Sequence, residues 1–163
     1  MRILAIRGRN LASLAEPFDI DFRAEPLASA GLFAIAGPTG SGKSTLLDAL
    51  CLALYDNTPR LRRAGTRGEL PDADGSIRAQ DPRTLLRRGS AEGRAEVEFV
   101  GNDGHDYCAT WTVRRAHGRA NGRLQATEMQ LVRLPEKQAI GNLKTEVLDA
   151  IQQRIGLSFE QFT

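Results

Sequence analysis

The segment that most constrains this chain is Gly37-Pro-Thr-Gly-Ser-Gly-Lys-Ser-Thr45. Its spacing, Gly-x-x-x-x-Gly-Lys-Ser, is the Walker A pattern, which binds phosphates when a strand leads into it and a helix follows. Residues 32–36 form a short, continuous apolar run, which is typical of a strand buried on both faces. Apolar residues recur at helical spacing from Lys43 to Tyr55 and predict a deeply packed helix. This context disfavours a glycine-rich turn that matches by chance.

The residue types in this segment suit a nucleoside triphosphate. Glycines let the backbone aim its N–H groups at phosphate oxygens, and the following helix adds the positive end of its dipole. We expect Lys43 to be the catalytic residue that reaches the β- and γ-phosphates, and the Ser44 hydroxyl to bind Mg²⁺. The predicted phosphate and metal site comprises Gly37, Pro38, Thr39, Gly40, Ser41, Gly42, Lys43, Ser44 and Thr45.

A complete ATPase also needs a buried strand that ends in an aspartate, often followed by a catalytic glutamate. Residues 97–100 lead to Asp103 only through a turn, and no other run provides this element. The guanine-reading Asn-Lys-x-Asp pattern is missing as well. The sequence therefore predicts a triphosphate cradle without the remaining machinery of an ATPase.

The rest of the chain predicts an α+β arrangement, because strands precede the phosphate loop and an antiparallel meander follows its helix. The turn Asn102-Asp-Gly104 favours a hairpin over a metal-ligand cluster. A last helix is expected after a cap at Asn142 and before Gly156. Residues 56–90 are expected to be a long excursion with one short helical piece. Strands are predicted at residues 2–7, 18–22, 95–100, 106–113 and 124–134.

Composition excludes several classes of protein. The 22 Lys and Arg residues nearly balance the 20 Asp and Glu residues, for a net charge of +2, so nucleic-acid binding is favoured only weakly. The apolar stretch 46–55 is too short to span a bilayer, and no signal peptide is recognised, so we expect a cytoplasmic protein without a membrane partner. Cys51 and Cys108 form neither a zinc motif nor a disulfide framework.

Three segments together resemble the N-terminal end of the bacterial SbcC family, the ATPase subunits of SbcCD exonucleases and relatives of SMC proteins and ABC ATPases. They are Ile6-Arg-Gly-Arg-Asn-Leu-Ala-Ser-Leu14, Leu32 to Asp48, and Leu86-Arg-Arg-Gly-Ser-Ala-Glu-Gly-Arg-Ala-Glu-Val-Glu-Phe99. The resemblance implies a P-loop NTPase fold of the ABC/SMC-type head, with a mixed sheet around the Walker A helix and an antiparallel β-layer. Residues 1–163 would be its N-terminal lobe, ending before the Q-loop and the coiled coil.

The resemblance also implies a function. The lobe would bind ATP and Mg²⁺ and drive a DNA-end-processing exonuclease and endonuclease complex in double-strand-break repair and recombination. Arg9 and Asn10 would contact the nucleotide near its phosphates or ribose, and Leu86, Arg87 and Arg88 would lie near the base. Implied partners are the C-terminal lobe of the same head, an SbcD-like nuclease subunit, a second head in an ATP-dependent head-to-head homodimer, and DNA without sequence preference. This lobe alone would bind nucleotide weakly and hydrolyse it negligibly.

Two alternatives stay open at this point. One is a small, self-sufficient P-loop NTPase or kinase, and the other is a non-enzymatic DNA-binding or assembly module. The hairpin Arg114–Arg123 carries four arginines and suits contact with a phosphate backbone, although a solvated tip is the favoured interpretation.

Overall fold

A six-stranded antiparallel sheet forms the centre of the molecule. The computed structural model describes residues 1–30, 32, 34–63, 68–73 and 75–163. The strand order is β2-β1-β5-β6-β7-β8. The strands are β1 (Arg2–Arg9), β2 (Phe18–Asp21), β5 (Glu92–Val100), β6 (Asp106–Arg114), β7 (Glu128–Arg133) and β8 (Gln138–Ala139).

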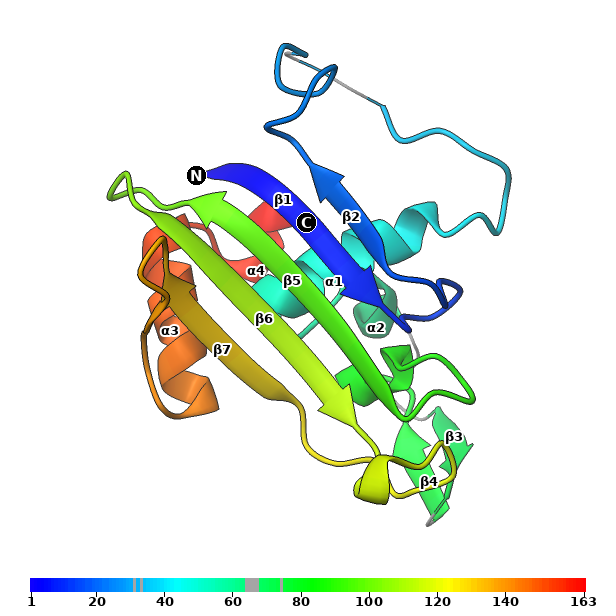
Figure 1. Cartoon of the computed structure of the whole chain (residues 1–163). Helices are drawn as coiled ribbons and strands as arrows, with labels where there is room; N and C mark the ends of the chain where they lie inside the picture. Colours follow the sequence, from blue (N-terminus) through cyan, green and yellow to red (C-terminus); the bar gives the residue numbers. More distant parts are fainter. Residues whose placement is uncertain (31, 33, 64–67, 74) are drawn as a thin grey trace.

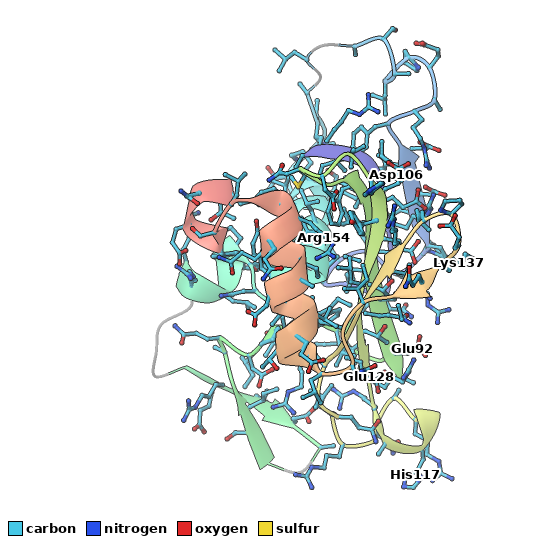
Figure 2. The ribbon with its side chains drawn as sticks, turned by 90° about the vertical axis from the view of Figure 1, so that its left-hand side faces the viewer. Glu92, Asp106, His117, Glu128, Lys137 and Arg154 are labelled. Carbon is cyan, nitrogen blue, oxygen red and sulfur yellow. The ribbon has the colours of Figure 1, made fainter. Side chains whose placement is uncertain are left out.

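Helices cover one face of this sheet (Figure 1). The helices are α1 (Lys43–Tyr55), α2 (Pro59–Arg63), α3 (Lys144–Ile155) and α4 (Phe159–Phe162). Helix α1 packs on β1, β5 and β6, whereas α3 packs on β7 and touches α1. Figure 2 shows α3, which carries Arg154, on one side of the sheet, and His117 at a tip of the molecule.

The alternation of buried and exposed residues along β5 and β6 explains why these two strands form the core of the sheet. Val97 and Phe99 on β5 pair with Ala109 and Tyr107 on β6, and all four are buried. Residues between them point to the other face, where Arg7 on β1 forms ion pairs with the carboxylates of Glu96 and Glu98. The predicted strands 2–7, 18–22, 95–100 and 106–113 and the turn at 102–104 are confirmed, and β7 occupies part of the predicted strand 124–134.

The prediction of a buried strand at residues 32–36 is wrong for the residues that the structure describes. Leu32 is 93% exposed and Ile35 is 46% exposed, and the described residues of this run belong to no strand; Phe33 lies outside the described residues. In Figure 1, residues 34–42 run outside the sheet as a wide arc before they enter α1. The apolar pattern indicates that the segment suits burial, but no described element covers it.

The expected mixed sheet also differs from what is observed. Every strand pair in the described residues is antiparallel, including the separate hairpin of β3 (Glu69–Asp72) and β4 (Gly75–Arg78). A mixed sheet requires a parallel pair, and none is found among the described residues. The α+β class holds, while the mixed layout stays a proposal.

Helix α1 is packed more deeply in its second half than in its first. The consecutive residues Leu52, Ala53 and Leu54 are almost fully buried, so the helix is enclosed on all sides there, but Leu47 is 54% exposed. The predicted helix is thus confirmed at residues 43–55, and its predicted deep packing is confirmed for the second half but not at Leu47.

The last helix ends as predicted but begins differently. Gly156 ends α3 with a left-handed backbone, φ 73°. At the other end the Glu146 carboxylate accepts hydrogen bonds from the backbone N–H groups of Asn142 and Leu143, at 2.8 and 3.2 Å. A glutamate in the first turn therefore does the capping that was predicted for the Asn142 side chain.

Residues 56–90 hold more regular structure than expected. Besides the short helix α2 they contain the β3–β4 hairpin and the 3₁₀ helix η1 (Pro82–Leu85). A second 3₁₀ turn, η2 (Ala116–Gly118), lies in the 114–123 hairpin. No helix among the described residues has the length and apolar character to cross a membrane.

Candidate nucleotide-binding site

The Walker A residues form an irregular loop that leads directly into α1. Gly40 and Gly42 adopt a left-handed backbone, with φ of 86° and 92°, which strongly favours glycine. At Gly42 space is limiting as well, because a Cβ there would lie 2.5 Å from Cδ2 of Leu14. Both conformation and packing therefore require glycine immediately before the helix.

Backbone donors are available where the loop meets α1. The N–H groups of Thr45 and Leu46 donate to the carbonyl of Gly42. Those of Gly42, Lys43 and Ser44 donate to no acceptor in the described residues, and no side chain caps this helix end. Unpaired N–H groups at the positive end of a helix dipole bind anions, so this end of α1 fits a phosphate.

The three side chains after the loop differ in their surroundings. Lys43 Nζ donates to the carbonyls of Gly37 and Pro38, at 2.6 and 2.7 Å, so its ammonium lies across the start of the loop. Ser44 is exposed on the first turn of α1. Thr45 is only 1% exposed, which directs it to the protein interior. Lys43 and Ser44 are thus accessible to a ligand, and Thr45 is not.

The described residues contain no group of three or more His, Cys, Asp or Glu side chains that could hold a metal ion. Helix α1 contains one acidic residue, Asp48, whose side chain is 5% exposed and lies 2.6 Å from Nη2 of Arg60. Burial raises the pKa of this carboxyl, and Arg60 opposes the rise. The residues present therefore fit a Mg²⁺ ion held by the Ser44 hydroxyl and by nucleotide phosphates, since Mg²⁺ commonly takes few protein ligands.

Two other predicted segments meet beside this loop. The Ala12 N–H donates to the Leu85 carbonyl at 2.8 Å, and the Arg87 N–H donates to the Asn10 carbonyl at 2.9 Å. These bonds pair residues 10–14 with residues 85–88 although they are far apart in the sequence.

The paired segments reach the Walker A residues through the loop 10–14. The Ser13 hydroxyl lies 3.2 Å from the Thr45 hydroxyl, and Leu14 packs against Gly42. The structure thus gathers the three predicted segments, residues 9–10, 37–45 and 86–88, at one place.

Not every predicted side chain is free to contact a ligand. Arg9 Nη2 donates to the Glu92 carboxylate at 2.8 Å, and Asn10 Nδ2 donates to the Glu92 carbonyl at 2.9 Å. Leu86 is 6% exposed and belongs to the core. Arg88 is exposed and has no hydrogen bond or ion pair with a described residue. Nucleotide contacts from these residues stay predictions.

Sequence reasoning missed Ser13 and Leu14 as neighbours of the phosphate loop. Both belong to the segment 6–14 that carries the family resemblance, which was the one available signal. Their contacts depend on left-handed backbone at Asn10 and Ala12, with φ of 53° and 43°. A residue pattern does not indicate that conformation at an alanine.

The arginines of the 114–123 hairpin are partly paired within the protein. Arg114 contacts the carboxylates of Glu92 and Glu128, and Arg115 Nη1 lies 2.8 Å from the Asp72 carboxylate of the β3–β4 hairpin. The hairpin therefore offers a phosphate backbone fewer free cations than its sequence indicates.

An apolar groove of about 720 Å³ lies beside α1, between the helix and strands β1 and β2. It is open to solvent, and two of its lining residues are the half-exposed Leu47 and Ile35. Its apolar lining consists of Ile3, Leu4, Ile6, Phe22, Leu27, Ala28, Ala30, Ile35, Leu47 and Leu50. Contiguous exposed apolar surface of this kind marks a binding face.

Comparison with known proteins supports the predicted resemblance. The family model described as AAA domain matches residues 5–162. A curated protein from Pseudomonas aeruginosa, named as the SbcC subunit of the nuclease SbcCD, is 53% identical over the whole chain, and one of the same name from Rhodobacter capsulatus is 50% identical over 99% of it. A DNA double-strand break repair Rad50 ATPase from Methanopyrus kandleri is 32% identical over 60% of the chain. The chain spans about 14% of the length of the Pseudomonas relative, 13% of the Rhodobacter relative and 9% of the Methanopyrus relative.

Proposed function

This chain belongs to the AAA-domain family, and on that premise we propose that it is the ATP-binding N-terminal lobe of an SbcC-like ATPase. That ATPase drives a DNA-end-processing nuclease complex in double-strand-break repair and recombination. One observation carries the proposal: accessible backbone donors, Lys43 and Ser44 lie together at the start of α1, in a chain similar throughout to the SbcC subunit of SbcCD. Nothing in the comparisons favours a self-sufficient kinase or a non-enzymatic module.

ATP would bind with its phosphates at residues 37–45. Lys43 exchanges the carbonyls of Gly37 and Pro38 for the β- and γ-phosphate oxygens, which are better acceptors for an ammonium group. Bound Mg²⁺ supplies charge neutralisation on these phosphates, and Ser44 provides a protein ligand for it. Arg88 is the exposed cation of the neighbouring segment and is available to the nucleotide.

The C-terminal lobe of the same head is the partner that we assign to the groove beside α1. The chain covers about 14% of the Pseudomonas relative, so most of such a protein lies outside these residues. A lobe seated in the groove would cover Leu47 and Ile35 and give the run 32–36 a strand to pair with. That lobe would supply the missing aspartate, catalytic glutamate and signature motif, and the mixed sheet would form on docking.

The remaining partners follow from the same proposal. They are an SbcD-like nuclease subunit, a second head in an ATP-dependent homodimer and DNA bound without sequence preference. Because the γ-phosphate adds charge at residues 37–45, ATP and ADP would bind with different affinity, as a conformational switch requires. We place this complex in the cytoplasm.

Calorimetric titration of the chain with Mg²⁺-ATP tests the proposed site. We expect Lys43→Ala to abolish measurable binding while the circular dichroism spectrum stays unchanged. Lys137→Ala is the matched control, because Lys137 lies in an exposed turn before β8. Undiminished binding by the Lys43→Ala chain would remove the Walker A assignment.

A further inference from the structure

The loop after β1 has a strained backbone. Asn10 and Ala12 both adopt the left-handed region, with φ of 53° and 43°. Alanine has no side-chain hydrogen bond to compensate for this conformation, so it persists only where neighbouring groups hold it. The loop 10–14 is therefore shaped by its contacts.

Arg87 is one of the groups that hold this loop. Its Nη1 donates to the carbonyls of Ser13 and Ala12, at 3.0 and 3.3 Å. Arg87 forms no ion pair with a described residue, so these two carbonyls, more than 70 positions earlier in the chain, are its side-chain partners. A guanidinium that bridges consecutive carbonyls fixes the orientation of both peptide groups.

The loop 10–14 in turn contacts both ends of residues 42–45, where α1 begins. The Ser13 hydroxyl lies 3.2 Å from that of the buried Thr45, and Leu14 packs against Gly42. Lys43 and Ser44 lie between these two contacts. A shift of Ser13 would therefore be felt by the two residues that face the phosphates and the metal ion.

We propose that Arg87 is a positioning residue that acts on the phosphate loop through Ser13, without touching the nucleotide itself. This inference rests on the proposed function and deepens it. It separates Arg87 from its neighbour Arg88, whose side chain has no partner in the described residues. It also adds Ser13 to the residues on which nucleotide affinity depends.

A double-mutant cycle tests the proposal, with Mg²⁺-ATP and Mg²⁺-tripolyphosphate as the two probes. Arg87→Ala and Ser13→Ala should each weaken the binding of both probes by about 3- to 10-fold, the effect of one lost hydrogen bond. The double variant should bind no more weakly than either single variant, since both changes remove the same link. Arg87→Lys keeps the charge, but its side chain is one atom shorter than the path to Nη1, so it should recover only part of the affinity.

Other outcomes overturn the proposal and identify what replaces it. Additive losses for both probes mean that Arg87 acts on the phosphates independently of Ser13, whereas a loss for ATP with none for tripolyphosphate means that Arg87 contacts the base or ribose directly. Full affinity in Arg87→Lys, combined with additive losses in the cycle, means that the charge acts on the phosphates at a distance.

The controls separate this test from folding and from the proposed function. Arg133→Ala, which removes an arginine on β7 near His105, three strands away from β1, should bind both probes normally. Thermal unfolding of each variant shows that binding is measured on folded protein, and Ser13→Ala with Arg87→Lys completes the cycle if Arg87→Ala does not fold. Failure of the unchanged chain to bind either probe would instead overturn the proposed function and this inference with it.

Discussion

The meander of β5, β6 and β7 and the segment that enters the phosphate loop are both apolar, yet one is fully packed and the other is not. Val97, Phe99 and Trp111 are completely buried under α1 and α3, whereas Leu32 is 93% exposed. The meander is covered by helices of the same chain. The phosphate-loop segment has no such cover among the described residues, which indicates that its apolar pattern suits contact with another part of the protein.

A core substitution in the meander should have the largest effect. Phe99 is completely buried, so Phe99→Ala should lower the free energy of unfolding by about 3–5 kcal/mol, because it removes apolar contact and leaves a cavity. Urea denaturation followed by circular dichroism measures this change. Leu32→Ala is the control from the other region, and it should cost less than about 0.5 kcal/mol. Similar losses for the two variants would contradict the comparison.

Replacing Gly42, which precedes α1, should reduce nucleotide affinity and stability more than replacing Gly104 in an open turn. Gly42→Ala adds a left-handed alanine and a collision with Leu14, so we expect at least about tenfold weaker nucleotide binding and a loss of about 1–3 kcal/mol of stability. Gly104→Ala, with φ of 77° and no atom near its Cβ, should cost only about 1 kcal/mol and leave binding unchanged. Equal nucleotide affinity in the two variants, measured by calorimetry, would show that Leu14 does not constrain the loop.

A substitution on the exposed face of α1 should have a smaller effect, confined to association with the C-terminal lobe. Leu47→Ser should leave the stability of the chain nearly unchanged, because Leu47 is 54% exposed. It should weaken association with the C-terminal lobe of the Pseudomonas relative by about tenfold, since docking would bury the rest of this side chain. Leu143→Ser, at the N-cap of α3 and exposed by 62%, is the control and should associate normally. Biosensor titration with equal affinities for both variants would place the docking face elsewhere.

The smallest effect concerns the ion pair between Arg9 at the end of β1 and Glu92 at the start of β5. The hydrogen bond from Arg9 lowers the pKa of Glu92, so the folded state binds a proton less readily than the unfolded state. Its contribution, below about 1 kcal/mol, is therefore complete above the ordinary glutamate pKa of about 4.5 and is lost as the pH falls below it. Glu92→Gln should make the urea midpoint less sensitive to pH between about pH 5 and pH 3, the range around that pKa. An unchanged slope would show that the pair contributes nothing.

Local pattern was sufficient to predict several parts of this molecule. Helix α1, the β5–β6 hairpin and the turn at 102–104 depend on periodicity and turn chemistry that neighbouring residues set. The glycine-rich loop before α1 was predictable for the same reason, because its left-handed glycines Gly40 and Gly42 lie in one contiguous segment.

Long-range contacts were beyond the reach of such patterns. The bond from Arg87 to Ser13 joins residues 74 positions apart, and no periodicity indicates it. The β3–β4 hairpin lacks alternation, since its residues lie mostly exposed. Residues 32–36 show a second limit of local patterns. Their apolar side chains predict burial but do not indicate which element would cover them.

ATP turnover tests the central claim most directly. The rate is measured for this chain alone, for the C-terminal lobe of the Pseudomonas relative alone, and for the two together with Mg²⁺. We predict negligible turnover by each part and clear turnover by the mixture, because the phosphate site and the catalytic carboxylate would then meet. Turnover by this chain alone would contradict the account, because it would show that the chain already holds a complete catalytic site.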